Sequence, residues 1–235
     1  MAVYGISDLH LPLGVDKPMD VFGKSWENYV YRLEENWRKS IKPTDCVVLP
    51  GDFCWAINLE EARKDFEFLN TLPGIKVLLK GNHDYWWDTL TKVENFMHEN
   101  GFENIYFIQN NHFCHKGTAL CGTRFWTSPE FEHQSAQDLK IYQRELGRVE
   151  FSLNAAKASG CDDIVFFVHY PPLLNGKADT AFLQLMKKYN ITDVYYGHLH
   201  SIPSGFQRLQ TVENVNFHLI SCNCIGFNPV LIRPQ

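Results

Sequence analysis

Five short motifs in this chain carry the side-chain types that hold divalent metal ions. In chain order they are Asp8-Leu9-His10, Gly51-Asp52, Gly81-Asn82-His83-Asp84, His169-Tyr170-Pro171-Pro172 and Gly197-His198-Leu199-His200. Their carboxylate, amide and imidazole groups suit Mn²⁺, Fe or Zn²⁺ better than a metal that prefers thiolates. An isolated Asp or His at a strand end is more often structural, but five such motifs in one chain predict a metal site.

Most of the motifs directly follow an apolar, β-branched run, and such runs predict strands. The expected strands cover residues 3–7, 46–50, 76–80, 105–108, 118–122, 164–168 and 194–196, with further strand pattern over 205–220. Open α/β sheets bind their ligands at the carboxyl ends of the strands, which is where most of these motifs would lie. Asp8 and His10, two residues apart in an extended segment, would face the same side.

Helical patterns lie between several of these runs. Apolar residues at three-and-four spacing predict a helix face over 26–37. Asn58 with Glu61 resembles a capping box, and Asp179 would cap a helix that reaches Tyr189. Alternating strands and helices predict an α/β architecture, and the strand-rich last third suggests an added antiparallel portion.

The longest helical pattern runs over residues 135–159. Its apolar residues repeat in alternating steps of three and four: Leu139, Tyr142, Leu146, Val149, Leu153 and Ala156. The favoured interpretation is a helix laid on the surface of the domain. A cap over the site or a dimer contact are the alternatives.

Composition and charge limit the class of protein. The 235 residues are 45% hydrophobic and show no linker or repeat, so we expect a single domain over 1–235. The net charge of −5 gives no basic field for a long nucleic acid. The seven cysteines lack a CxxC pair, and the sequence predicts no leader or membrane span. We therefore expect reduced thiols and a cytoplasmic location.

The order of the five motifs resembles that of the calcineurin-like metallophosphoesterase superfamily, over residues 8–200. The resemblance implies a four-layer α/β sandwich of two mixed central sheets flanked by helices, with two divalent metal ions (Mn, Fe or Zn) bridged by one carboxylate. It implies a first metal held by Asp8, His10, Asp52 and His200. It implies a second metal held by Asp52, Asn82, His169 and His198. His83 would be the catalytic histidine, and Asp84 would orient it.

Elementary chemistry agrees with this assignment. Two divalent ions roughly 3.5–4 Å apart can activate a water to hydroxide and clamp the oxygens of a phosphate. Against Asp8, Asp52 and the hydroxide they leave about one positive charge, because His and Asn ligands are neutral. That charge would attract a phosphoester, and the departing alkoxide would take a proton from His83 as general acid.

The motifs also restrict the substrate. Protein Ser/Thr phosphatases of the superfamily carry Gly-Asp-x-x-Asp-Arg-Gly, whereas this chain has Gly51-Asp52-Phe53-Cys54-Trp55, which lacks that arginine. We therefore expect a modest-sized phosphorylated substrate, with a nucleotide as one candidate, and favour phosphodiester over monoester cleavage. Candidate substrate contacts are Trp86 and Tyr170, as aromatic faces, and Arg124, which alternatively is a surface residue.

Two other functions remain open from the sequence. A nuclease would require a basic groove, which the overall charge does not favour. A non-catalytic scaffold that binds a protein partner would be expected to lose ligands or the catalytic histidine, and none is missing. The oligomeric state is not predicted.

Overall fold

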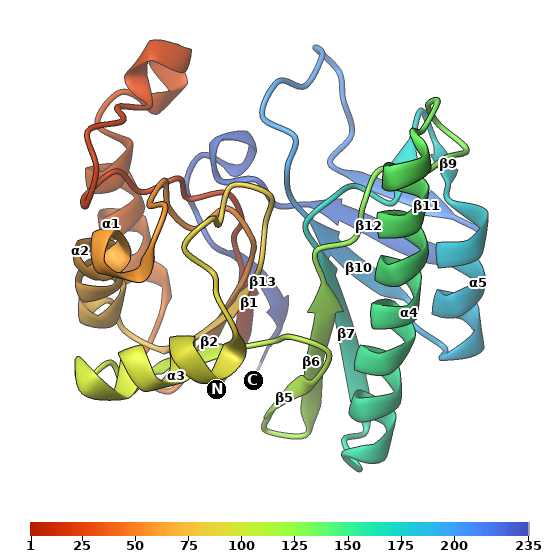
Figure 1. Ribbon diagram of the computed structural model, residues 1–235, viewed down its shortest axis with the longest axis horizontal. Helices are drawn as coiled ribbons and strands as arrows, with labels where there is room; N and C mark the ends of the chain where they lie inside the picture. The colour runs from red at the N-terminus through yellow and green to blue at the C-terminus, as the bar shows by residue number, and fades with distance from the viewer. Residues whose placement is uncertain (235) are drawn as a thin grey trace.

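Buried runs of Val, Leu, Ile and Phe form two sheets that face each other in the computed structural model, which describes residues 1–234 (Figure 1). The first sheet has the strand order β13-β1-β2-β3-β4. Its strands are β1 (Val3–Gly5), β2 (Cys46–Pro50), β3 (Ile75–Leu79), β4 (Ile105–Phe107) and β13 (Val230–Arg233). Strands β1 to β4 are parallel, and β13 joins β1 in the antiparallel direction.

The second sheet has the strand order β11-β12-β10-β7-β6-β5. Its strands are β5 (His112–His115), β6 (Thr118–Thr123), β7 (Asp163–Val168), β10 (Asp193–Tyr196), β11 (Leu209–Val212) and β12 (Val215–Leu219). The four inner strands are parallel, and the two edge strands are antiparallel. A two-stranded hairpin, β8 (Leu173–Leu174) and β9 (Lys177–Ala178), lies outside both sheets.

Helices cover the outer face of each sheet. The first sheet carries α1 (Tyr29–Ser40), α2 (Leu59–Thr71) and α3 (Leu90–Glu99), and the second carries α4 (Ala136–Ala158) and α5 (Thr180–Lys188) (Figure 1). Short 3₁₀ turns span Asp20–Phe22, Lys24–Trp26 and Cys222–Ile225. The expected four-layer α/β sandwich of two mixed sheets is thus confirmed.

Strand β7 contributes side chains to two hydrophobic cores, one on each face of the second sheet. Val165 and Phe167 belong to the core between the sheets, whereas Phe166 and Val168 belong to the core under α4 and α5. Successive side chains of a strand point to opposite faces, so a strand buried on both sides reads as a continuous apolar run.

The predicted elements differ from the structure mainly at their ends. The first helix begins at Tyr29 rather than at residue 26, because Asn28 has a left-handed backbone with φ of 51°. Asn58 caps α2 as predicted, accepting from the Glu61 N–H. Strands β5 and β13 and helix α3 were not predicted, since each is short or partly exposed.

The long helix lies on the sheet, as the favoured interpretation expected. Helix α4 begins after Ser135, which accepts from the Asp138 N–H, and packs along β5 and β6. Its buried face is not purely apolar, because Glu145 and Ser152 are buried beside Val149. The Ser152 hydroxyl donates to Asn111 O and accepts from Gly122 N–H, which ties the helix to the sheet.

None of the helices described over residues 1–234 is both long and apolar enough to cross a bilayer.

Asp179 links helices α4 and α5 to the loops that contain Ser128 and Pro172. Its buried carboxylate caps α5 by accepting from the Phe182 N–H at 2.8 Å, as predicted. It also accepts from the Tyr142 hydroxyl of α4 at 2.8 Å and from the Ser128 hydroxyl. The same residue's N–H donates to Pro172 O, so the segment that follows His169 is held too.

Replacing Asp179 by Ala should destabilise the protein by about 3 kcal/mol, since a helix cap is lost and two buried hydroxyls lose their acceptor. Urea denaturation measures this change. Tyr142→Phe, which removes one of the three bonds, should cost about 1 kcal/mol. Equal losses for the two variants would contradict a role of Asp179 as a three-way anchor.

Candidate metal centre

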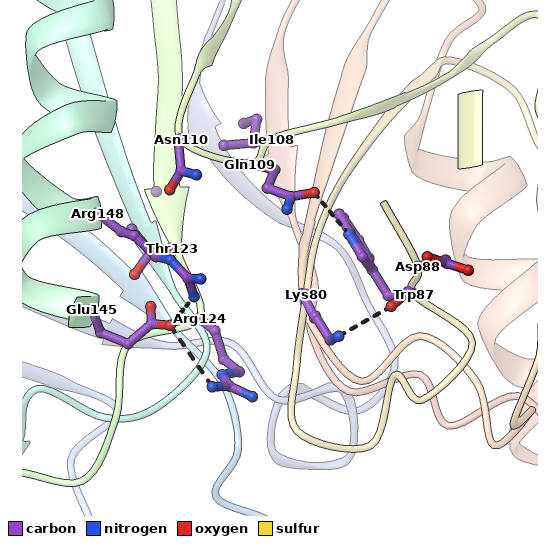
Figure 2. Close-up of a pocket in the computed structure, with 11 residues that line it drawn as sticks. Lys80, Trp87, Asp88, Ile108, Gln109, Asn110, Thr123, Arg124, Glu145 and Arg148 are labelled. Carbon is purple, nitrogen blue, oxygen red and sulfur yellow. Dashed lines mark hydrogen bonds and ion pairs between the residues drawn. The ribbon is translucent and has the colours of Figure 1, made fainter. Parts of the chain in front are cut away.

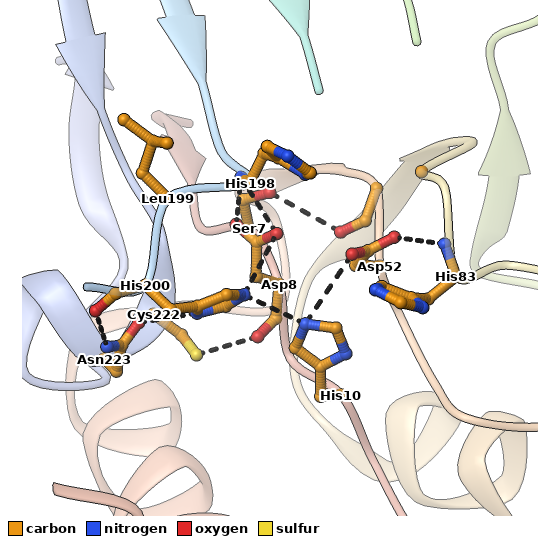
Figure 3. A network of polar contacts seen from close by, with 12 residues as sticks. Ser7, Asp8, His10, Asp52, His83, His198, Leu199, His200, Cys222 and Asn223 are labelled. Carbon is orange, nitrogen blue, oxygen red and sulfur yellow. Dashed lines mark hydrogen bonds and ion pairs between the residues drawn. The ribbon is translucent and has the colours of Figure 1, made fainter. Parts of the chain in front are cut away.

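The five motifs meet at one edge of the molecule, where the carboxyl ends of strands from both sheets converge. Asp8, Asp52 and Asn82 follow β1, β2 and β3, while His169 and His198 follow β7 and β10. A bridge between Ser7 and Ser221 links the two halves of this edge. Figure 3 shows the resulting network of acidic and imidazole side chains.

The first candidate ligand group consists of Asp8, His10 and His200, whose donor atoms all lie within 4.8 Å of one another. The Nε2 atoms of the two histidines are 3.0 Å apart, and His200 Nε2 is 3.8 Å from Asp8 Oδ1. Two nitrogens on one tetrahedral ion lie about 3.3 Å apart, so this spacing fits a shared metal.

The second group consists of Asp52, His169 and His198, again within 4.8 Å. His169 Nε2 is 3.2 Å from His198 Nδ1 and 2.7 Å from Asn82 Oδ1. His169 Nδ1 lies 3.1 Å from Pro50 O, and such a bond on the second ring nitrogen fixes the orientation of a ligating imidazole.

Asp52 lies between the two groups. Its Oδ2 is 3.6 Å from His10 Nε2 of the first group and 3.5 Å from His169 Nε2 of the second. Its Oδ1 accepts from the His83 N–H at 2.8 Å, so the carboxylate is held in place by the motif that follows β3.

The electrostatics of the cluster favour the binding of positive charge. Burial, with the nearby carboxylates of Asp84 and Asp8, raises the pKa of Asp52 to about 9. Burial also raises the pKa of Asp8, and it lowers the pKa of His198 to about 4. A divalent cation stabilises the ionised form of buried carboxylates and binds the lone pairs of neutral imidazoles. This cluster offers both kinds of group. The residues therefore fit two metal ions.

Four of the candidate ligands have a left-handed backbone, which non-glycine residues adopt uncommonly. The φ angles are 61° at Asp8, 46° at His10, 54° at Asp52 and 70° at His198. Such conformations cluster at functional sites, where surrounding contacts hold them. Here the Asp8 carboxylate accepts from the His198 N–H at 3.0 Å, so two of the strained residues hold each other.

Two motif glycines allow the close approach of these segments. A Cβ at Gly81 would lie 2.2 Å from Asp52 Oδ1, and one at Gly197 would lie 2.1 Å from Ser7 Oγ and 2.4 Å from Asp8 Oδ2. Any side chain at either position would displace a candidate ligand.

Asp84 has a different set of contacts from the one expected. Its buried carboxylate accepts from the N–H groups of Gly81, Asp52 and Phe53 and from the Trp86 indole, at 2.7–3.0 Å. Among the described residues it makes no hydrogen bond with the His83 ring. All four bonds leave the carboxylate no place for the imidazole, so Asp84 instead holds the loops after β2 and β3 together.

Asn223 was missed by the sequence reasoning. Its Oδ1 lies 2.9 Å from His200 Nδ1, and its Nδ2 donates to His200 O at 2.8 Å. The neighbouring Cys222 donates from Sγ to Asp8 O at 2.9 Å. The string Cys222-Asn223-Cys224 carries no signal of this role, because its position depends on the bridge at Ser221.

His83 opens into an aromatic hollow of about 470 Å³. Trp55 stacks on the His10 ring with centroids 4.5 Å apart and approaches the His83 ring at 4.7 Å. The other lining residues are His10, Met19, Phe22, Ser25, Trp26, His200, Ser201 and Asn223. Candidate ligands of the first group and the candidate catalytic histidine therefore share one cavity, here named the aromatic hollow.

The three candidate substrate contacts lie in different surroundings. Trp86 is only 2% exposed and packs on Phe66, so the interpretation of Trp86 as a substrate contact is corrected. Tyr170 lies beside the ligand group, with its ring 4.4 Å from that of His198. Arg124 lines a second hollow, and its O accepts from the His169 and Tyr170 N–H groups.

Solved structures share the fold across nearly the whole chain at low sequence identity. A phosphopantetheinyl hydrolase from Mycobacterium tuberculosis is 15% identical, with a TM-score of 0.54 and coverage of 100% of this chain and 96% of that one. A protein of unknown function from Aquifex aeolicus is 16% identical, with a TM-score of 0.51 and coverage of 98% and 95%. At these identities the likeness concerns the fold alone.

The family comparison covers the part of the chain that carries all five motifs. No protein of curated function matches the sequence. The family model of the calcineurin-like phosphoesterases matches residues 1–201, which include every candidate ligand described above. This chain therefore belongs to the calcineurin-like phosphoesterase family.

Proposed function

We propose that this protein hydrolyses phosphodiesters of modest size, with two metal ions at the centre and His83 as general acid. The observation that carries the proposal is the position of His83. It lies beside candidate ligands of the first group and lines the hollow where a leaving group would sit. The family supports metal-dependent phosphoester hydrolysis in general.

The residues divide the work between them. Asp8, His10 and His200 would hold one ion, Asn82, His169 and His198 the other, and Asp52 both. When bound, the ions supply an activated water and positive charge for the phosphate oxygens.

His83 would donate the proton that the departing oxygen needs. Burial, Lys17 and His200 lower the pKa of His83, so the free imidazole is mostly neutral at pH 7. A bound anionic phosphate favours the protonated form and counteracts this shift.

Room on both sides of the phosphorus favours a diester over a monoester. The aromatic hollow adjoins the first ligand group, and its Trp26 and Trp55 faces suit a planar or apolar leaving group. The second hollow is lined by Arg124, whose backbone O accepts from the N–H of His169 in the other ligand group. A monoester would fill only one of the two.

Hydrolysis of bis(p-nitrophenyl) phosphate and p-nitrophenyl phosphate, side by side in Mn²⁺, tests the proposal. We expect diester turnover to exceed monoester turnover. Turnover of the monoester alone would overturn the diester assignment, and no turnover of either ester by metal-loaded protein would overturn the catalytic proposal.

Replacing His83 by Ala should keep both metals and reduce turnover by a factor of about 10² to 10⁴. The loss should be larger for diphenyl phosphate than for bis(p-nitrophenyl) phosphate, because the poorer leaving group needs protonation more. Kinetics on both esters, with metal content measured on the same samples, separate the two effects. An equal loss on both would rule out a general acid.

Chelation should abolish turnover and lower the melting temperature. Metals that offset the buried carboxylates stabilise the fold by about 2.7 kcal/mol per ion at a hundredfold excess over Kd. Thermal melts before and after treatment with a chelator, and after return of Mn²⁺, measure this. An unchanged melting temperature would mean that the ligand cluster is stable without cations.

Asp84→Asn should weaken metal binding, because an amide N–H₂ would face backbone N–H groups in the loop that carries Asp52. We expect at least a tenfold lower Mn²⁺ affinity by calorimetry at a temperature where the variant is folded. Trp86→Phe, which removes one of the four bonds but keeps the carboxylate, should lose stability with little change in metal affinity. Equal metal affinity in Asp84→Asn would exclude a positioning role for Asp84.

A further inference from the structure

The second hollow, of about 280 Å³, is lined by three cationic side chains, Lys80, Arg124 and Arg148. Figure 2 shows Arg148 and Glu145 reaching in from α4, with Lys80 and Trp87 facing them from the other side. It is too small for a whole drug-sized ligand and suits one polar group. We name it the cationic hollow.

The cations outnumber the carboxylates that could neutralise them. Arg148 and Arg124 share one carboxylate, Glu145, at 2.5 Å and 3.7 Å. Among the described residues Lys80 has no carboxylate within ion-pair distance, and its Nζ donates only to Trp87 O at 3.2 Å. Asp88 also lines the hollow, but Lys92 pairs with it at 2.8 Å. Three positive charges less one from Glu145 leave an excess of two.

Glu145 is built into the helix in a way that aims the arginines. It is 1% exposed on the buried face of α4, where an apolar residue would be expected. Its Oε2 accepts from the Phe125 N–H at 3.1 Å, in the loop that carries Arg124. Burying a carboxylate is costly, and ion pairs with the partly exposed side chains of Arg124 and Arg148, 23% and 47% exposed, offset little of that cost. A fixed Glu145 instead holds two guanidinium groups at the rim of the hollow.

Two residues that line the cationic hollow, Lys80 and Arg124, are linked to the candidate metal centre through the backbone. Lys80 is two residues from Asn82, and Arg124 O accepts from the His169 N–H at 3.2 Å. His169 belongs to the second ligand group, and Asn82 Oδ1 lies 2.7 Å from its Nε2. The aromatic hollow, by contrast, is lined by His10 and His200 of the first group. A diester that places its leaving group beside His83 would extend its other arm toward these cations.

We propose that the cationic hollow binds a second phosphate of the substrate, carried on the arm of the diester that does not leave. This inference rests on the proposed function for the identity of the arm. A phosphate monoester carries about 1.5 to 2 negative charges at pH 7, which matches the excess of two. Arginine forks match its oxygens, and Thr123 lines the same hollow. The substrate class is then a phosphodiester with a terminal phosphate.

Two p-nitrophenyl esters of thymidine 5′-phosphate, with and without a 3′-phosphate, test this inference. The scissile bond and leaving group are the same in both. We expect kcat/KM to be about tenfold or more higher for the 3′-phosphorylated ester, chiefly through a lower KM. In Arg148→Gln the ratio should fall toward one, whereas Arg144→Gln should keep it. Arg144 is an exposed arginine of the same helix that does not line the hollow.

A binding measurement keeps the two proposals separable. Calorimetry of the Mn²⁺-loaded protein with thymidine 3′,5′-bisphosphate and with thymidine 5′-monophosphate needs no turnover. Tighter binding of the bisphosphate that depends on Arg148 supports the cationic hollow, even if neither ester is hydrolysed and the proposed function fails. Equal affinities, or a preference that Arg148→Gln leaves intact, overturn it, even if both esters are hydrolysed. The arginines would then serve only the ion pair with Glu145.

Discussion

Carboxylates without access to water meet at the line where the two sheets join. Asp8, Asp52 and Asp84 are each at most 1% exposed, and burial raises the pKa of all three. Their charges are tolerated only where backbone N–H groups and cations surround them. The carboxylate of Asp84 is fully hydrogen-bonded to backbone N–H groups and the Trp86 indole, whereas Asp8 and Asp52 each have an oxygen close to a candidate ligand histidine. The loops, the glycines and the residues with left-handed backbone at this edge keep Asp84 bonded to backbone N–H groups and keep Asp8 and Asp52 close to the histidines.

The two hollows differ in the chemistry of the side chains that line them. One side offers aromatic faces and a histidine, and the other offers guanidinium and ammonium groups. A substrate that spans the metal centre would therefore meet apolar surface at one end and positive charge at the other. Because loops set these surroundings while the strands set the ligands, family membership leaves the substrate open.

The motifs predicted which residues lie close together better than the aromatic and helical patterns predicted the surroundings of those residues. The parallel strands of the first sheet bring Asp8, Asp52 and Asn82 to one edge, whereas His169 follows β7 of the second sheet and meets them because the two sheets face each other. The burial of Trp86 could not be inferred, because sequence next to a motif does not show whether a tryptophan packs in the core or faces the site.

Contacts distant in sequence were the least predictable. Glu145 was hidden by the apolar periodicity of its helix, because a heptad count ignores a polar residue within the buried face. Asn223 reaches His200 only after β12 has brought the chain back to the sheet edge. The local spacing of residues in the sequence does not predict this contact between Asn223 and His200.

The contact between Asn223 and His200 also bears on how the protein could be shortened. The stretch shared with the family ends at residue 201, yet the side chain that orients the last histidine comes 22 positions later, on a 3₁₀ turn. Strands β11 and β12, at one end of the second sheet, and β13, at the edge of the first, also lie beyond that point. A fragment cut at the boundary of the shared stretch would retain every candidate ligand and lose Asn223, which contacts one of them. We therefore expect that the shortest functional fragment of this protein extends beyond residues 1–201, the segment that the family model matches.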